Sequence, residues 1–245
     1  MFKNSFVRFH STQYTVYELM TNSLTEIYSE HHKKNRGRNF VFYEKERSEF
    51  IQHHTRNMGK RSILDIGCRD GALTRYAISK ENTITGCDID TDSLHHAKER
   101  GINTVYMDLN GPWEEIRDKR YDIVMAFEII EHLYFPEKVL EKIKAHLKED
   151  AYLIGSVPNA FSWMNRILLF LGTKKGTPLS DPTHINHFSY SELKATLKKH
   201  FTKVEILPLV TQNRKILAKI SPGLFGAGFL FKCSNKPYST TKEQL

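Results

Sequence analysis

The chain has 245 residues, of which 40% are hydrophobic and 26% charged, so it is long enough for one globular domain with extra elements. The three cysteines, Cys68, Cys87 and Cys233, are scattered, which indicates buried thiols rather than a disulfide framework. No apolar run is long enough to predict a transmembrane helix, and residues 1–20 lack the apolar core of a secretory signal. The net charge of +8 is unevenly distributed. Residues 1–60 carry 10 basic and 6 acidic residues, residues 61–160 carry 13 and 18, and residues 161–245 carry 13 and 4. The acidic central segment therefore suits a cationic ligand, and the basic flanking segments suit an anionic partner or are simply solvated.

Residues 1–58 are expected to form a helical cap before the main domain. Residues 16–27 carry apolar side chains at helical spacing, and residues 40–57 are predicted to form a second helix that ends at Gly59. Between them, residues 31–38 form a basic run that indicates a loop, either solvated or touching an anionic substrate.

The stretch from residue 62 to residue 90 has the order strand, glycine turn, helix, strand. Residues 62–66 are typical of a buried parallel strand, Gly67 and Gly71 interrupt the run, and residues 72–79 can continue as a helix. A second apolar run ends in Asp88, about twenty residues beyond the turn, which is the spacing of a ribose-binding carboxylate in a nucleotide-binding βαβ unit. Because this turn has only two glycines, it is less suited to binding a pyrophosphate, and NAD is therefore disfavoured as the ligand.

Strands and helices alternate through the rest of the main domain, which is expected at residues 59–235 before a polar tail at 236–245. Further strands are expected at residues 103–107, 121–127, 151–157, 202–209 and 228–233, and helices at 90–100, from Pro136 onward, and at 191–200. This alternation predicts an α/β fold with a doubly wound sheet.

Two insertions, at about residues 160–183 and 211–227, exceed this minimal fold. The first would form a helix that is apolar over most of its surface. Such a helix either packs as a lid over the site or contacts a membrane through residues 161–175, with Arg166, Lys174 and Lys175 at the headgroups.

Four motifs then follow one another at regular spacing. They are Asp65-Ile66-Gly67-Cys68-Arg69-Asp70-Gly71, Gly86-Cys87-Asp88, Tyr106-Met107-Asp108-Leu109, and Tyr121-Asp122-Ile123-Val124 followed by Phe127-Glu128. Over roughly residues 40–235 the chain resembles the class I S-adenosylmethionine (SAM) methyltransferases, with Arg69 in place of that family's middle glycine. The resemblance implies a Rossmann-like sheet of seven strands with an antiparallel last strand, and SAM as the cofactor.

The same resemblance implies roles for individual residues. Asp65, Gly67 and Gly71 would shape the methionine end of the cofactor site, Asp88 with Ile89 would hold the ribose, Asp108 and Leu109 would flank the adenine, and Phe127 would back the cofactor.

The sequence Glu128-Ile129-Ile130-Glu131-His132 follows the fourth strand and is expected to form a helical turn with both glutamates and His132 on one face. His132 is the candidate general base for a hydroxyl nucleophile, unless it only orders the loop. The alternative is a divalent metal on Glu128, Glu131, His132 and His184, because this pattern also resembles the metal site of enzymes that methylate the terminal 2′ hydroxyl of small RNAs.

The sequence therefore predicts a SAM-dependent methyltransferase, cytoplasmic with optional peripheral contact at the inner membrane face. Its acceptor is expected to be a small molecule, anionic or lipid-linked, methylated at oxygen. Nucleic acid is disfavoured because no RNA-binding module is recognisable. A metal-dependent RNA 2′-O-methyltransferase and a non-catalytic SAM-binding protein remain as alternatives.

Overall fold

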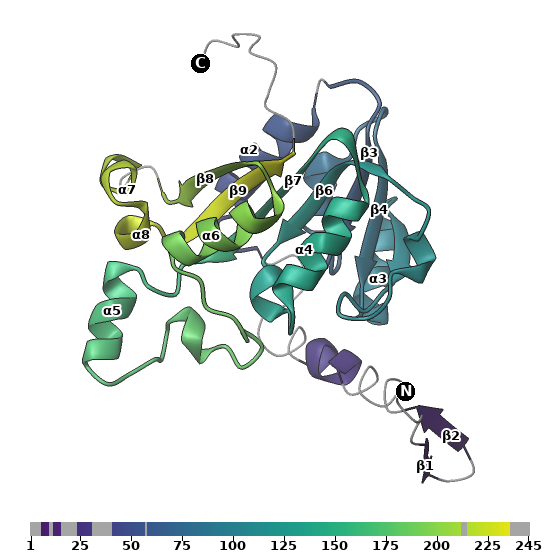
Figure 1. Cartoon of the computed structure of the whole chain (residues 1–245), viewed down its shortest axis with the longest axis horizontal. Coiled ribbons are helices and arrows are strands. Elements are labelled where there is room, and N and C mark those ends of the chain that lie inside the picture. Colours follow the sequence, from purple (N-terminus) through teal and green to yellow (C-terminus); the bar gives the residue numbers. More distant parts are fainter. Residues whose placement is uncertain are drawn as a thin grey trace.

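The computed structural model describes residues 6–9, 12–15, 24–30, 41–56, 58–211 and 215–235. Figure 1 shows one main sheet with helices on both faces, and a two-stranded ribbon, β1 (Phe6–Phe9) and β2 (Thr12–Thr15), toward the N-terminus. None of the helices in these ranges is long and apolar enough to span a bilayer.

The main sheet has seven strands in the order β5-β4-β3-β6-β7-β9-β8. Strands β3 to β7 pair in parallel, whereas β9 is antiparallel to both β7 and β8, which confirms the predicted doubly wound sheet. The chain order reverses between β3 and β6, and ligands of such sheets bind at that point, outside the carboxyl ends of the strands. The strands are β3 (Ser62–Ile66), β4 (Thr83–Asp88), β5 (Asn103–Tyr106), β6 (Tyr121–Phe127), β7 (Leu147–Pro158), β8 (Lys203–Leu209) and β9 (Gly228–Ser234).

Helices cover the two faces of the sheet because each presents an apolar stripe to it. Leu140 and Leu197 bring α4 and α6 into one core, and Ile51 and Ala97 bring α2 and α3 into the other; all four side chains are buried. The helices are α2 (Glu44–Thr55), α3 (Thr91–Glu99), α4 (Pro136–Ala145), α5 (Trp163–Phe170), α6 (Tyr190–His200), α7 (Lys215–Ile220) and α8 (Pro222–Phe225).

Local structure differs from the sequence-based expectation after β3 and in the N-terminal segment. The helix expected at residues 72–79 is only a 3₁₀ turn, Thr74–Ala77, since the Thr74 hydroxyl donates to the Asp65 carboxylate at 2.6 Å and holds the segment against β3. In the N-terminal cap, helix is found at residues 24–30, and the ribbon was not predicted. The basic run 31–38 and the tail 236–245 lie outside the described residues, and the boundary between residues 58 and 59 stays a prediction.

The three cysteines are buried free thiols, as expected. Burial raises the pKa of Cys68 and Cys87 well above the usual range, so both remain protonated and unreactive.

Candidate functional site

A pocket lies where the carboxyl ends of β3, β4, β5 and β6 meet. It contains seven of the residues predicted to hold a cofactor, whereas Gly71 lies outside its lining. Residues at the start of α2 and within 24–30 also line it. The seven are Asp65, Gly67, Asp88, Ile89, Asp108, Leu109 and Phe127.

The turn after β3 requires its two glycines. Gly67 has φ +68°, and a Cβ there would lie 1.9 Å from Cδ1 of Ile129. Gly71 has φ +75°, and a Cβ there would lie 2.6 Å from Cδ1 of Ile102. Both positions therefore combine left-handed backbone with close packing, which glycine alone satisfies without strain.

Arg69, which replaces the middle glycine, keeps the left-handed path at φ +50°. That conformation costs a non-glycine residue about 1 kcal/mol. The backbone N–H of Arg69 donates to Oδ2 of Asp88 at 2.8 Å, and its Nε donates to Oδ1 of Asp70 at 3.1 Å. The turn is thus bonded directly to the acid that ends β4, and the two halves of the motif form one structure.

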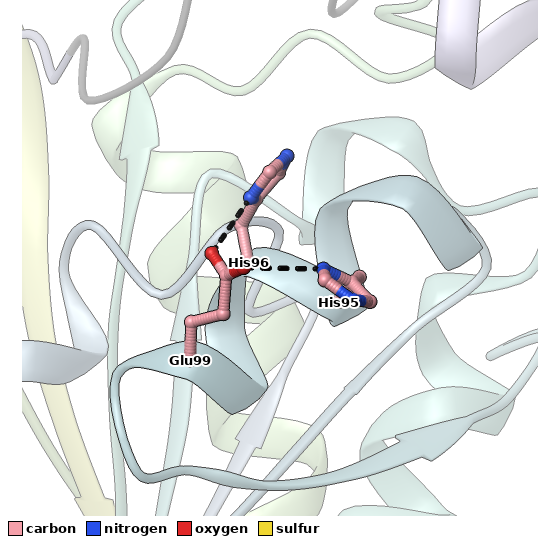
Figure 2. A group of neighbouring side chains, drawn as sticks. All are labelled: His95, His96 and Glu99. Carbon is pink, nitrogen blue, oxygen red and sulfur yellow. Dashed lines mark hydrogen bonds and ion pairs between the residues drawn. The ribbon is translucent and has the colours of Figure 1, made fainter.

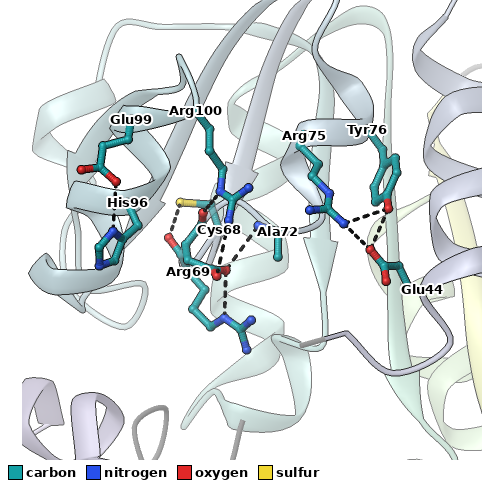
Figure 3. A network of polar contacts seen from close by, with 10 residues as sticks. Glu44, Cys68, Arg69, Ala72, Arg75, Tyr76, His96, Glu99 and Arg100 are labelled. Carbon is teal, nitrogen blue, oxygen red and sulfur yellow. Dashed lines mark hydrogen bonds and ion pairs between the residues drawn. The ribbon is translucent and has the colours of Figure 1, made fainter. Parts of the chain in front are cut away.

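Neighbouring helices hold this turn and the 3₁₀ turn that follows it (Figure 3). Arg100, at the end of α3, donates from Nε to the Asp70 carbonyl at 2.7 Å. On the other side, Glu44 of α2 accepts a hydrogen bond from Tyr76 at 2.6 Å and pairs with Arg75. Side chains from α2 and from the end of α3 therefore support this segment of the pocket.

Carboxylates dominate the electrostatics of the pocket. Asp88 accepts a further hydrogen bond from the Asp90 amide at 2.9 Å. Burial raises the pKa of Asp65 to about 7, and the nearby charge of Asp88 adds to the shift. Tyr28, on residues 24–30, is surrounded by acids, and burial chiefly raises the pKa of its hydroxyl above the usual range. Such a wall favours a cationic ligand.

The loop after β5, which carries Asp108, is tied down by groups that sequence analysis missed. Lys142 of α4 places its ammonium against the carbonyl oxygens of Leu109 at 3.2 Å and Gly111 at 2.5 Å. The indole of Trp113 also donates to the Leu109 carbonyl, at 3.2 Å. These bonds fix the predicted adenine end of the pocket.

His132 also lines the pocket, on the 3₁₀ turn that follows β6. Its Nδ1 is 2.9 Å from the carbonyl oxygen of Thr183, an acceptor, so Nδ1 carries the hydrogen and the neutral ring keeps its lone pair on Nε2. Nε2 lies 4.0 Å from Oε1 of Glu131, which is buried. The Tyr28 hydroxyl donates to the His132 carbonyl at 3.3 Å.

Glu128 does not share a face with this group, so that part of the prediction is wrong. Its φ of +56° interrupts the expected helical turn, and its carboxylate bonds Arg47 at 2.7 Å and Ser156 at 2.9 Å. Glu131, His132 and His184 do come together, with one potential ligand atom from each within 4.8 Å of the others. The structure therefore brings three of the four candidate metal ligands together.

Arg47 is a pocket residue that sequence analysis missed. Its side chain is buried, and its Nε makes no hydrogen bond among the described residues. A signal existed, since Arg47 precedes the buried Ile51 by four positions and so shares its helix face. A buried guanidinium beside the glycine turn offers a site for an anionic group of a ligand.

A second group of histidines lies on the outside of α3. Figure 2 shows His95 and His96 directed at Glu99, with Nδ1 to carboxylate distances of 3.5 and 3.1 Å. Neither these histidines nor Glu99 lines the pocket. They form surface ion pairs when protonated, of the kind that stabilises an exposed helix by a few tenths of a kcal/mol.

Comparison with known proteins agrees with this architecture. A family described as methyltransferase domain matches residues 33–201. The ubiquinone biosynthesis O-methyltransferase of Actinobacillus pleuropneumoniae is 28% identical over 131 residues, covering 50% of this chain and 53% of the relative, so the chain spans about half the length of that relative.

Solved structures share the fold. A SAM-dependent methyltransferase from Archaeoglobus fulgidus superimposes with a TM-score of 0.60 at 20% identity, over 84% of this chain and 98% of its own. A small RNA methyltransferase superimposes with the same score at 19% identity, over 80% of this chain and 26% of its own. With the family match covering most of the chain, the protein belongs to the methyltransferase domain family, within the class I SAM-dependent superfamily.

Proposed function

We propose that the protein transfers the methyl group of SAM to an oxygen atom of a small molecule. The observation that carries this proposal is the pocket, in which the glycine turn, Asp88 and the Asp108 loop meet along one edge of the sheet. SAM supplies an electrophilic methyl group on a sulfonium, and the acidic wall suits that positive charge.

The residues present fit the cofactor from end to end. The Asp88 carboxylate, held by the amides of Arg69 and Asp90, can still accept from a ribose diol, because each carboxylate oxygen has two acceptor sites. The bonded loop after β5 would hold the adenine beside Asp108. At the other end, the buried Nε of Arg47 would donate to the methionine carboxylate.

His132 would serve as the general base. Its Nε2 would accept the proton from the acceptor hydroxyl as that oxygen attacks the methyl group, and the Thr183 carbonyl would hold the ring in the required tautomer. The nearby Glu131 carboxylate would stabilise the imidazolium that results. Methyl transfer itself needs mainly an in-line arrangement of the two reactants.

The acceptor would be a small molecule that is anionic or lipid-linked, and the protein would work in the cytoplasm with peripheral contact at the inner membrane face. Support comes from the +9 charge of residues 161–245 and from the apolar first insertion. The relative named above is called an O-methyltransferase of ubiquinone biosynthesis, which is consistent with an oxygen nucleophile.

Calorimetry with SAM and with S-adenosylhomocysteine, followed by a screen for methyl uptake, tests the proposal. We expect both nucleosides to bind and one class of small acceptor to gain a methyl group. No binding of either would overturn the proposal. Binding without transfer to any acceptor would favour the non-catalytic alternative.

A metal-dependent activity is the second candidate, favoured by the convergence of Glu131, His132 and His184. A carboxylate and two imidazoles suit zinc and other first-row divalent ions. Activity lost with EDTA, restored by one such ion and absent in Glu131→Gln would support it. An RNA acceptor in the same assay would identify the RNA 2′-O-methyltransferase alternative, whereas activity unchanged in EDTA excludes the metal.

A further inference from the structure

The two insertions expose large apolar side chains that a soluble fold would normally bury. On and just after α5, Phe170 is 90% exposed and Leu171 69%; on α7, Ile216 and Ile220 are both 77% exposed. We call α5, residues 171–176 and α7 the insertion surface. When several large apolar side chains are exposed on the same part of a molecule, they mark a site of contact with another apolar surface.

These side chains do not cover the pocket. Among the described residues that line it, none comes from 160–182 or 211–227. A lid would place the apolar face of α5 against the site. The apolar side chains of the insertion surface therefore need a different partner.

The two insertions are fixed relative to each other, so the exposure does not come from a frayed end. Asn159 is buried where β7 gives way to the first insertion, and its Nδ2 donates to the carbonyl oxygens of Gly223 at 2.9 Å and Gly226 at 2.8 Å in the second. Asn165 of α5 donates to the Asn159 carbonyl at 2.9 Å. In Figure 1, α5, α7 and α8 lie together on one side of the molecule.

The charged side chains on the insertion surface itself are all basic, and the first acid of the first insertion is Asp181, beyond that surface. Residues 160–180 and 211–227 contain no Asp or Glu. The exposed basic side chains of the insertion surface are Arg166, Lys174, Lys175, Lys215 and Lys219. Apolar groups flanked by lysine and arginine alone are typical of helices that lie in the interface of an anionic bilayer.

Both insertions begin at the carboxyl ends of their strands, on the same edge of the sheet at which the pocket lies. β7 and β8 run in the same direction, since each is antiparallel to β9, and each insertion follows the carboxyl end of its strand. We propose that the insertion surface docks on an anionic lipid bilayer, with Phe170, Leu171, Ile216 and Ile220 in the acyl boundary. If the proposed function holds, this docking would bring the edge of the sheet that carries the pocket close to acceptors that reside in the membrane.

Flotation of the full chain with lipid vesicles tests the docking. We expect binding to phosphatidylcholine vesicles containing roughly a third phosphatidylglycerol, and much weaker binding to phosphatidylcholine alone. Phe170→Ser with Ile220→Ser should weaken binding about tenfold or more, and Lys174→Glu with Lys175→Glu should do the same. Ile78→Ser and Lys80→Glu, at exposed positions elsewhere, are the matched controls and should change nothing.

Three outcomes would overturn the proposal. The first is that the wild-type chain does not bind anionic vesicles, and the second is that the control variants lose as much binding as the test variants. The third is that the chain forms a dimer in solution that the Phe170 and Ile220 substitutions dissociate, while no vesicle binding is seen. Calorimetry with SAM on the same variants keeps the two proposals apart, because substitutions on the insertion surface should leave cofactor affinity unchanged, and vesicle binding should persist even if SAM does not bind.

Discussion

Nδ1 of His132 lies 2.9 Å from the carbonyl oxygen of Thr183, although 51 positions separate the two residues. Thr183 belongs to the loop between α5 and α6, and its own position is fixed by the Asp181 carboxylate, which accepts from the Thr183 hydroxyl at 2.6 Å. A loop from beyond the fifth parallel strand thus determines which imidazole nitrogen faces the pocket.

Replacing His132 tests its role as a base. His132→Ala should lower kcat by on the order of 10² to 10⁴-fold while SAM affinity stays unchanged, because the imidazole acts only on the acceptor proton. Steady-state kinetics and calorimetry on one preparation separate the two quantities. His95→Ala, at an exposed position on α3, is the control and should match the wild type. A fully active His132→Ala enzyme would rule out the base.

Asp88→Ala should weaken SAM binding by about 1–3 kcal/mol, through the loss of charge-assisted bonds to the ribose. Calorimetry measures the change, and circular dichroism confirms folding, which matters because the Arg69 and Asp90 amides lose their acceptor. Asp92→Asn removes an exposed acid nearby and serves as the control. Unchanged affinity in folded Asp88→Ala would refute the ribose assignment.

Much of the fold followed from local pattern. Apolar runs set the strands, and the spacing from Gly67 to Asp88 placed a turn and an acid that the Arg69 amide joins. Contacts between distant segments were beyond such reasoning. The bonds from Lys142 to the loop after β5 depend on how α4 packs, and no spacing in the sequence encodes that packing.

Backbone conformation was the other limit. Glu128 was expected in a helical turn because the sequence after β6 allows one, yet it adopts φ +56° and turns toward Arg47. Left-handed conformations at non-glycine positions arise where tertiary contacts compensate their cost. The Ser156 hydroxyl and the Arg47 guanidinium supply those contacts here, and both come from other elements.

Protonation of Asp65 should contribute to the pH dependence of the protein's stability. Its pKa is about 7 in the folded protein against an ordinary 3.8, so between roughly pH 4 and 7 the folded state holds a proton that the unfolded chain has released. Stability from this group is therefore lost as pH rises through that window. Asp65→Asn should remove this slope, which thermal unfolding from pH 5 to 8 would reveal. Identical slopes in the two proteins would contradict the assignment.

The same shift links Asp65 to the cofactor. A bound sulfonium favours the ionised carboxylate, so SAM should bind more tightly as pH rises through about 7 and should release a proton on binding. Calorimetry in buffers with different ionisation enthalpies counts that proton. Asp65→Asn is expected to bind SAM without proton release near neutral pH, and a proton count unaffected by the substitution would place the titrating group elsewhere.

Arg47 and Glu128 allow stability to be separated from ligand binding. Their side chains are 4% and 14% exposed, so Arg47→Met would remove the ion-pair partner of a mostly buried carboxylate and should destabilise the protein by about 3–5 kcal/mol. Adding Glu128→Gln should restore much of that loss, because the carboxylate charge that Arg47 balanced disappears. SAM affinity should remain low in the double variant, since Arg47 would no longer meet the methionine carboxylate. Denaturant unfolding and calorimetry on the two single variants and the double variant complete the test, and a double variant that recovers both stability and affinity would show that Arg47 only neutralises Glu128.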